Sequence, residues 1–271
     1  MTSLGSSLSI LSLFGPDRST LSADAITESL GFSRPTGYRY LRELVTSGLL
    51  VRLAPGTYAL GPRIIELDWQ IRQSDPLLRA GLPVIQDLSS DTGFEVNLIG
   101  RYGDHIVTTH QQHGLERLPL SFGRGRPMPL FRGAGSKIVV AHFPRARLRR
   151  LYELHREDAR QANLGSNWED VRQALAAIRK QGFAVSYGEL DPGYVGVAAP
   201  VFAADNDVLG SVIAALSRSR LAVTDVDRLT GRIRAAGHAI SLRLAQVGHA
   251  AAVTPSSLHA VTAAPRSRQS A

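Results

Sequence analysis

SRPTGYRYLREL (Ser33–Leu44) has the spacing of an amphipathic helix whose two faces differ in chemistry. Ser33 can cap the first turn, Pro35 is tolerated there, and Gly48 ends the helix. The spacing predicts an inward face that consists of Tyr38, Leu41, Leu44 and Val45. It predicts an outward face that consists of Thr36, Arg39, Tyr40 and Glu43. Such a helix packs on a small core with one face and offers hydrogen-bonding groups with the other.

Two further helices are predicted before this one. Apolar residues recur at helical spacing ahead of Gly15-Pro16, at Leu4, Leu8, Leu11 and Phe14. A second helix is expected from the cap residue Ser22 to Leu30. Gly31 closes it, because glycine adopts the left-handed conformation of a helix end at little cost.

A hairpin is predicted after Gly48. Leu49–Arg52 and Thr57–Leu60 have strand composition and flank the turn Ala54-Pro55-Gly56. Helix, helix, tight turn, helix and hairpin are the order of a winged helix-turn-helix. We therefore expect residues 1–62 to form a winged helix-turn-helix DNA-binding domain.

The outward face of the predicted recognition helix suits the DNA major groove. Its hydroxyl groups can bond phosphate oxygens, and Arg34 or Arg39 could reach guanine edges. Gly37 costs roughly 1 kcal/mol of helix stability relative to alanine but permits close backbone approach. The residues expected to contact double-stranded DNA are Ser22, Ser33, Arg34, Thr36, Gly37, Tyr38, Arg39, Tyr40, Arg42 and Arg52. The alternative is that the charged residues form only a solvated helix face.

A larger domain follows Gly61-Pro62. Residues 63–75 are expected to form a linker helix with Ile64, Leu67 and Ile71 on one face. Residues 76–247 alternate helical and strand-like stretches. Helices are predicted at 76–92, 135–143, 147–155, 168–181 and, capped by Thr224, at 225–244; strands are predicted at 94–100, 105–110, 182–187, 195–203 and 208–217. This order predicts an α+β domain with an antiparallel sheet flanked by helices. Residues 248–271 are expected to be a disordered tail.

Composition narrows the class of protein. The net charge of +8 permits a polyanionic partner, but residues 1–62 hold only five arginines against four acidic residues. The absence of cysteine excludes disulfides, thiolate metal sites and thiol nucleophiles. No apolar run reaches the ~18 residues of a membrane helix, and Met1–Phe14 lacks the pattern of a signal peptide. We therefore expect a cytoplasmic protein with no membrane partner.

Three ordered segments resemble the IclR family of bacterial regulators, over roughly residues 4–246. The first is Ser33–Leu44 followed by Gly48-Leu49-Leu50 and Gly56–Gly61. The second, Pro129–Lys137, is similar to the family's Pro-Leu-His-x-Thr-Ala-x-Gly-Lys segment. The third, Ile178–Phe202, contains Gly196 and Ala198-Ala199-Pro200-Val201-Phe202, similar to the family's Gly-x-x-x-Ala-Ala-Pro-Val-Phe signature.

The resemblance implies a GAF-like effector domain. Because a single helix-turn-helix buries too little surface for tight specific binding, we also expect a homodimer or tetramer that binds a pseudo-palindromic operator. The resemblance also implies a mostly apolar pocket with a few hydroxyls, formed by Met128, Leu130, Ala134, Gly135, Ser186, Tyr194, Gly196, Ala215 and Ser217. Ser136 departs from the family pattern, and Ser186 stands where members that bind small oxo-acids carry an acidic residue. A small organic or aromatic acid is the expected effector, held by hydroxyls and by backbone amides near Gly135-Ser136.

Two other classes of function would need residues that this sequence lacks. An enzyme with an appended DNA-binding module would need a catalytic set, and the sequence has no Gly-x-Ser-x-Gly elbow and no His-Glu-x-x-His motif. A nonspecific nucleic-acid-binding protein would need a dense basic stripe or exposed aromatics. We expect neither of these, and no catalytic residue, metal or cofactor.

Overall fold

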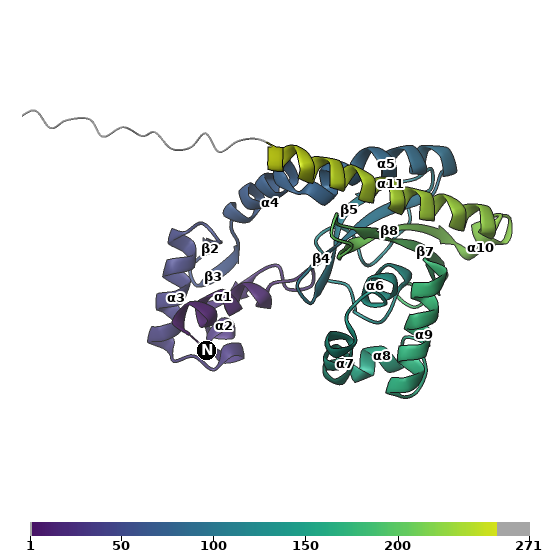
Figure 1. Cartoon of the computed structure of the whole chain (residues 1–271). Coiled ribbons are helices and arrows are strands. Elements are labelled where there is room, and N and C mark those ends of the chain that lie inside the picture. The colour runs from purple at the N-terminus through teal and green to yellow at the C-terminus, as the bar shows by residue number, and fades with distance from the viewer. Residues whose placement is uncertain (1, 254–271) are drawn as a thin grey trace, which may run out of the picture. The chain divides into compact units, whose positions relative to one another are not determined.

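The computed structural model describes residues 2–253, which divide into two compact units between Asp75 and Pro76 (Figure 1). The first unit contains α1 (Ser3–Ser9), a 3₁₀ turn η1 (Ile10–Leu13), β1 (Leu21–Ser22), α2 (Ala23–Leu30), α3 (Arg34–Thr46), β2 (Leu50–Ala54), β3 (Thr57–Leu60) and α4 (Arg63–Ser74). Its three strands pair antiparallel in the order β1-β3-β2. The predicted helices and hairpin are present, and β1 was missed because two residues show no periodicity.

Local hydrogen bonds explain where the first helices begin and end. The Ser22 hydroxyl accepts from the Ala25 N–H (3.1 Å) at the start of α2, and Gly31 closes that helix with φ 65°. Ser33 occupies the N-cap of α3, but its hydroxyl bonds Thr36 Oγ1 (2.9 Å) instead of a backbone N–H. The expected starts are therefore confirmed, with a different role for the Ser33 side chain.

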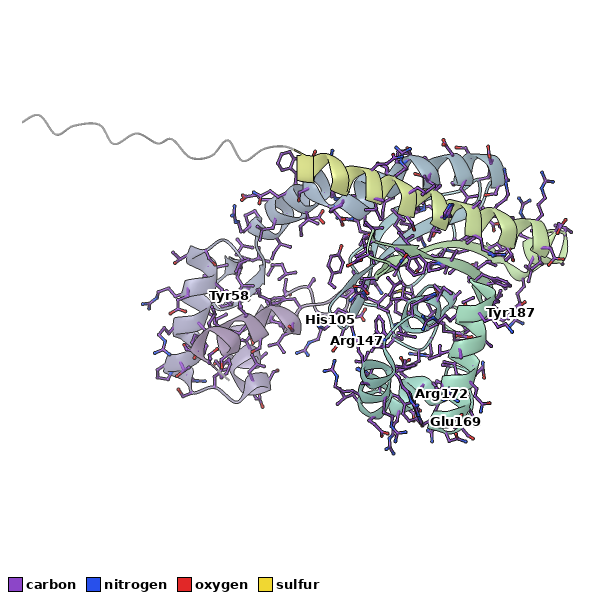
Figure 2. The ribbon with its side chains drawn as sticks, in the orientation of Figure 1. Tyr58, His105, Arg147, Glu169, Arg172 and Tyr187 are labelled. Carbon is purple, nitrogen blue, oxygen red and sulfur yellow. The ribbon has the colours of Figure 1, made fainter. Side chains whose placement is uncertain are left out.

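The core of the first unit corrects the predicted faces of α3. Tyr40 is only 5% exposed, packs edge-to-face on Phe32 (5.4 Å between ring centroids) and lies within hydrogen-bond distance of Ser3 Oγ (3.3 Å). Tyr58 of β3 belongs to the same core (Figure 2). Tyr38, expected to face inward, is 45% exposed. The two tyrosines have exchanged the faces that the spacing predicted.

The second unit is an α+β domain, as expected. It contains α5 (Pro76–Thr92), β4 (Glu95–Tyr102), β5 (His105–Gln112), α6 (Ala134–Val140), α7 (Arg145–Leu154), α8 (Arg156–Arg160), α9 (Trp168–Gln181), β6 (Ala184–Tyr187), β7 (Tyr194–Phe202), β8 (Val208–Ser217), α10 (Arg218–Ala222) and α11 (Val226–Val253). The five strands form one antiparallel sheet in the order β5-β4-β8-β7-β6. The short helices α8 and α10 were not predicted.

Each face of this sheet has its own core. Leu78, Ile85 and Ile233 of α5 and α11 pack on one face, which Figure 1 shows covered by these two long helices. Phe131 and Ile138, at and beside α6, pack on the other face together with side chains of α7 and α9. The hydrophobic alternation of β4, with Leu98 toward one core and Ile99 toward the other, follows from the two-residue period of a strand.

The last helix differs from the prediction at both ends. Asp225, not Thr224, caps α11, since its carboxylate accepts from the Arg228 N–H (3.0 Å). Thr224 instead donates its hydroxyl to the Arg220 carbonyl (2.6 Å). The helix was expected to end before Gly248 but continues to Val253. The rest of the expected tail, residues 254–271, lies outside the described residues.

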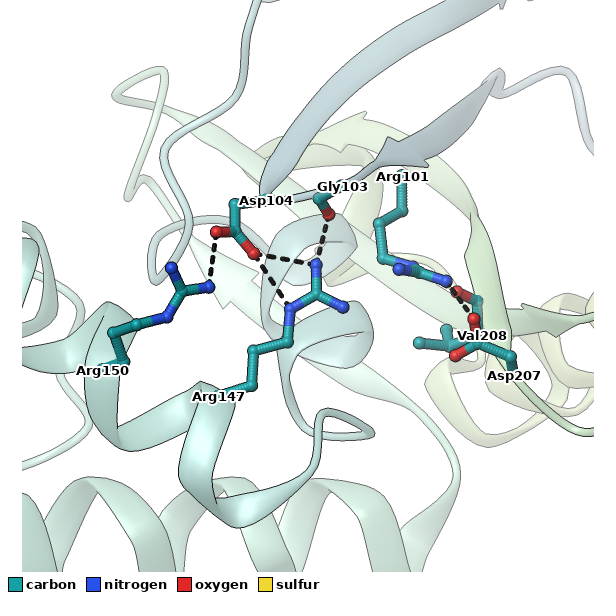
Figure 3. Close-up of polar contacts among 7 residues, drawn as sticks. All are labelled: Arg101, Gly103, Asp104, Arg147, Arg150, Asp207 and Val208. Carbon is teal, nitrogen blue, oxygen red and sulfur yellow. Dashed lines mark hydrogen bonds and ion pairs between the residues drawn. The ribbon is translucent and has the colours of Figure 1, made fainter.

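Arginines fix the turn between β4 and β5 (Figure 3). Arg147 Nε and Arg150 Nη2, both from α7, donate to the two carboxylate oxygens of Asp104 at 3.0 and 2.7 Å. On the same hairpin, Arg101 donates to the Val208 carbonyl (2.6 Å). Partial burial acts to raise the pKa of Asp104, but the hydrogen bonds from both arginines of α7 outweigh it and hold that pKa below its ordinary value.

Candidate DNA interface and effector cavity

The solvent-exposed face of α3 is basic and aromatic. Arg34, Tyr38, Arg39 and Arg42 are all exposed and follow one another at helical spacing. Thr36 is half-buried at the first turn. Arg34 is paired with Asp24 of α2 (3.4 Å), and both side chains are exposed, so this ion pair is weak and can exchange for a phosphate.

The wing lies beside the start of α2. Arg52 on β2 is exposed, and the backbone N–H of Ala23 donates to the carbonyl of Gly56 in the wing turn (2.9 Å). Ser22, exposed at the same point, keeps its hydroxyl beside the wing. The helix face and the wing thus present separate sets of donors within one unit.

Two residues of the predicted DNA-contacting set are part of the protein's own packing. Tyr40 lies in the core, as described above. Gly37 is buried against α2, where an added Cβ would lie 2.1 Å from Thr27 Cγ2. The close backbone approach that this glycine permits is therefore an approach between α2 and α3, not one to DNA.

A cavity opens in the second unit on the sheet face that carries α6. Its volume is about 510 Å³ including its open mouth. The strands β4, β5, β7 and β8 form its floor, and the segments that follow β5 and β6 cover it. Its lining is Asn97, Ile99, Thr108, Leu120, Phe122, Met128, Ser186, Gly188, Glu189, Leu190, Asp191, Tyr194, Val195, Gly196, Ile213 and Ala215.

The structure brings together part of the predicted pocket. Five of its residues line the cavity: Met128, Ser186, Tyr194, Gly196 and Ala215. Four do not. Leu130 and Ala134 are packed in the core on the same sheet face, and Gly135 lies against Ile99. Ser217 caps α10, where it accepts from the Arg220 N–H (3.3 Å), and lines a separate cavity.

The effector's carboxylate was expected on backbone amides near Gly135-Ser136, and the protein's own side chains bind the two N–H groups just before them. Glu189 accepts from the Gly133 N–H (2.9 Å), and Ser186 accepts from the Ala134 N–H (3.0 Å). The second oxygen of Glu189 is ion-paired with Lys137, and both side chains are buried. An internal carboxylate thus compensates both the helix dipole and the buried lysine.

Sequence reasoning missed four polar residues of the cavity: Asn97, Thr108, Glu189 and Asp191. Thr108 and Asn97 lie on the sheet floor, and Thr108 Oγ1 donates to the Phe122 carbonyl (3.0 Å). For Asn97 the available signal was a polar residue between the apolar residues Val96 and Leu98 of β4. β5 is mostly polar, so Thr108 gave no such signal.

Comparison with known families identifies the chain. The family described as bacterial transcriptional regulator IclR C-terminal matches residues 70–242, and the IclR helix-turn-helix domain matches residues 3–54. The chain belongs to the IclR family. It is thus a transcriptional regulator with a helix-turn-helix DNA-binding domain and a C-terminal effector-binding domain, as the resemblance of its motifs implied.

Similar proteins agree with this assignment. The HTH-type transcriptional regulator KipR of Bacillus subtilis is 24% identical, over 88% of this chain and 95% of that protein. The Pca regulon regulatory protein of Pseudomonas putida is 26% identical, over 85% of this chain and 76% of that protein.

Among residues 2–253, none of the helices has the length and apolar composition that a membrane span requires.

Solved structures share the fold. An IclR transcriptional regulator from Alicyclobacillus acidocaldarius superposes with a TM-score of 0.74 at 24% identity, covering 89% of this chain and 98% of that one. An IclR homologue from Microbacterium hydrocarbonoxydans, solved in complex with 4-hydroxybenzoate, gives a TM-score of 0.70 at 20% identity and covers 90% of this chain and 99% of that one.

Proposed function

We propose that this IclR-family regulator binds a pseudo-palindromic operator as a homodimer or dimer of dimers, and that a small organic or aromatic acid in the effector cavity changes its operator affinity. The proposal rests above all on the exposed face of α3. Arg34, Arg39 and Arg42 are directed to solvent there, and a single such helix buries too little surface for tight specific binding. Two copies that bind successive major grooves supply the missing surface. The protein acts on cytoplasmic DNA.

Exposed apolar side chains on α1 and α4 support the dimer. No residue of α4 is buried, and Ile65, Trp69 and Ile71 are 73%, 63% and 53% exposed. Leu4 on α1 is 70% exposed. Apolar groups on one small unit favour contact with a second copy over contact with water.

The cavity favours a ligand with an apolar body. Ile99, Phe122 and Met128 supply apolar walls. The N–H groups of Gly133 and Ala134 at the start of α6 are already bonded, whereas Arg218 lies beside the wall, with Nη2 3.4 Å from where a Cβ on Gly188 would be. We place the effector's carboxylate there. The 4-hydroxybenzoate complex of a family member makes aromatic acids the first compounds to test.

Operator titration with and without candidate acids tests the proposal. A tenfold change in operator affinity corresponds to ~1.4 kcal/mol of coupling between the two sites. Ala215→Leu should narrow the cavity and abolish the response, whereas Ala134 would be a poor choice because it is fully buried and does not line the cavity. Unchanged operator affinity of the unliganded variant is the control, since the DNA-binding unit has its own core. A normal ligand response in Ala215→Leu would place the effector elsewhere, and turnover of the acid would support an enzyme instead.

A further inference from the structure

The floor of the effector cavity holds a buried polar atom without a partner. Asn97 on β4 is 6% exposed, lines the cavity, and its Oδ1 forms no hydrogen bond. A buried acceptor that has lost water and gained no donor destabilises the folded state. Native proteins rarely retain such a group without a reason.

The neighbours of Asn97 do not supply the missing donor. Gln111, directly across on β5, donates its side-chain amide to Glu95 Oε1 (2.7 Å). Thr108 donates its hydroxyl to the Phe122 carbonyl (3.0 Å). Ile213, the partner of Asn97 on β8, is apolar. None of these strand neighbours donates to Asn97 Oδ1, which lies at the cavity floor without a hydrogen-bond partner.

We infer that Asn97 is the residue that selects the effector, and that it does so by accepting a hydrogen bond from a hydroxyl or N–H group on the end of the ligand that reaches the sheet. This inference rests on the proposed effector cavity and names the ligand chemistry that the cavity recognises. A ligand without that donor leaves Asn97 unsatisfied and binds more weakly, because a site built around a buried polar group discriminates against analogues that lack its partner. The ligand class is thus a hydroxylated or N–H-bearing compound, not a purely apolar acid.

The inference predicts an unusual effect on the unliganded protein. Asn97→Leu keeps the same branched arrangement of side-chain heavy atoms and removes the unpaired acceptor, so it should raise Tm by about 2–6 °C. Thr109→Val on β5 is the matched control: Thr109 is also buried, but its hydroxyl donates to the Leu98 carbonyl (3.2 Å). Loss of this bond should lower Tm. Both variants are measured in the full chain by thermal unfolding.

Phenol and toluene then test recognition without assuming which acid is the natural effector. They have nearly the same shape, and only phenol carries a donor. Phenol should bind the wild-type protein about 3–10-fold more tightly than toluene, and Asn97→Leu should abolish that preference. Binding is followed by ligand-observed NMR without DNA.

Several results would overturn the inference: Asn97→Leu lowers Tm as Thr109→Val does, the two probes bind wild type equally, the preference persists in Asn97→Leu, or neither probe binds. The proposed function would fail in a different experiment, the operator titration. There, operator affinity would stay constant while a hydroxylated acid occupies the cavity.

Discussion

The contact between α2 and α3 allows a quantitative prediction for Gly37→Ala. The added Cβ would lie 2.1 Å from Thr27 Cγ2, whereas two carbon atoms at rest are about 3.5–4.0 Å apart. The helices would have to separate by roughly 1.5 Å. Thr27 cannot rotate its methyl away freely, because its hydroxyl donates to the Asp24 carbonyl (2.9 Å).

Overpacking of this kind costs about 1–3 kcal/mol, and replacing a helical glycine by alanine returns up to about 1 kcal/mol. We therefore expect Gly37→Ala to lower the free energy of unfolding by about 1–2 kcal/mol, measured by urea denaturation followed by circular dichroism. Operator affinity should fall with it, because the separation moves α3 against the wing.

Thr27→Ser provides the test of cause. Serine keeps the hydroxyl bond to Asp24 but lacks the methyl group that the new Cβ would meet. The double variant should recover most of the stability that Gly37→Ala loses, so the two changes should be non-additive. If Gly37→Ala is as stable as wild type, or if the two effects simply add, the close contact between α2 and α3 is not why glycine stands there.

Three more predictions follow from the described contacts. Arg39→Ala should cost roughly 1–3 kcal/mol at one or two base positions, whereas Arg52→Ala should weaken binding to all sequences and lower the salt slope by about one, in operator titrations at several salt concentrations. Lys137→Met should destabilise the protein by about 3–5 kcal/mol in urea denaturation, because it leaves Glu189 buried without its ion-pair partner, and the double variant with Glu189→Leu should recover much of the loss. Burial lowers the pKa of His142, so the unfolded chain binds its proton more readily. The free energy of unfolding should fall as pH drops below about 6.5, and His142→Gln should reduce that slope.

Each of these has a contradicting result. Unchanged operator binding in both arginine variants would mean that the recognition face lies elsewhere. A stable Lys137→Met variant would show that Glu189 does not require its ion-pair partner. An equal pH slope in wild type and His142→Gln would assign acid sensitivity to other groups.

Much of the first unit could be predicted because its signals are local. Ser22, Gly31 and Gly48 mark helix ends through their own side chains and backbone preferences, and the structure confirms all three. The orientation of α3 could not be fixed in the same way. Leu41 and Leu44 are on the buried face of α3 whether Tyr38 or Tyr40 joins them there. Gly37 is also on the buried face, but a residue without a side chain does not indicate this in the sequence.

The effector cavity depends on contacts that a sequence does not display. The family resemblance indicated five lining residues: Met128, Ser186, Tyr194, Gly196 and Ala215. A resemblance identifies segments, but it does not show which residue of a segment faces the cavity. Ala134 and Gly135 belong to the right segment and face the core. The sequence did not indicate Asn97 or Glu189. Glu189 stands out only through its ion pair with Lys137, which is distant in the chain, and Asn97 only through its lack of a hydrogen-bond partner.

The position of β8 in the sheet affects how the protein is synthesised. β8 lies between β4 and β7, and Glu95 pairs with Ala215 across 120 positions of sequence. On the ribosome, β4 emerges long before β8. Until β8 is made, the edge of β4 that pairs with it has no neighbouring strand, and exposed strand edges of this kind promote aggregation. Nascent chains that stall before Val208 should depend on chaperones, although their winged helix is already complete.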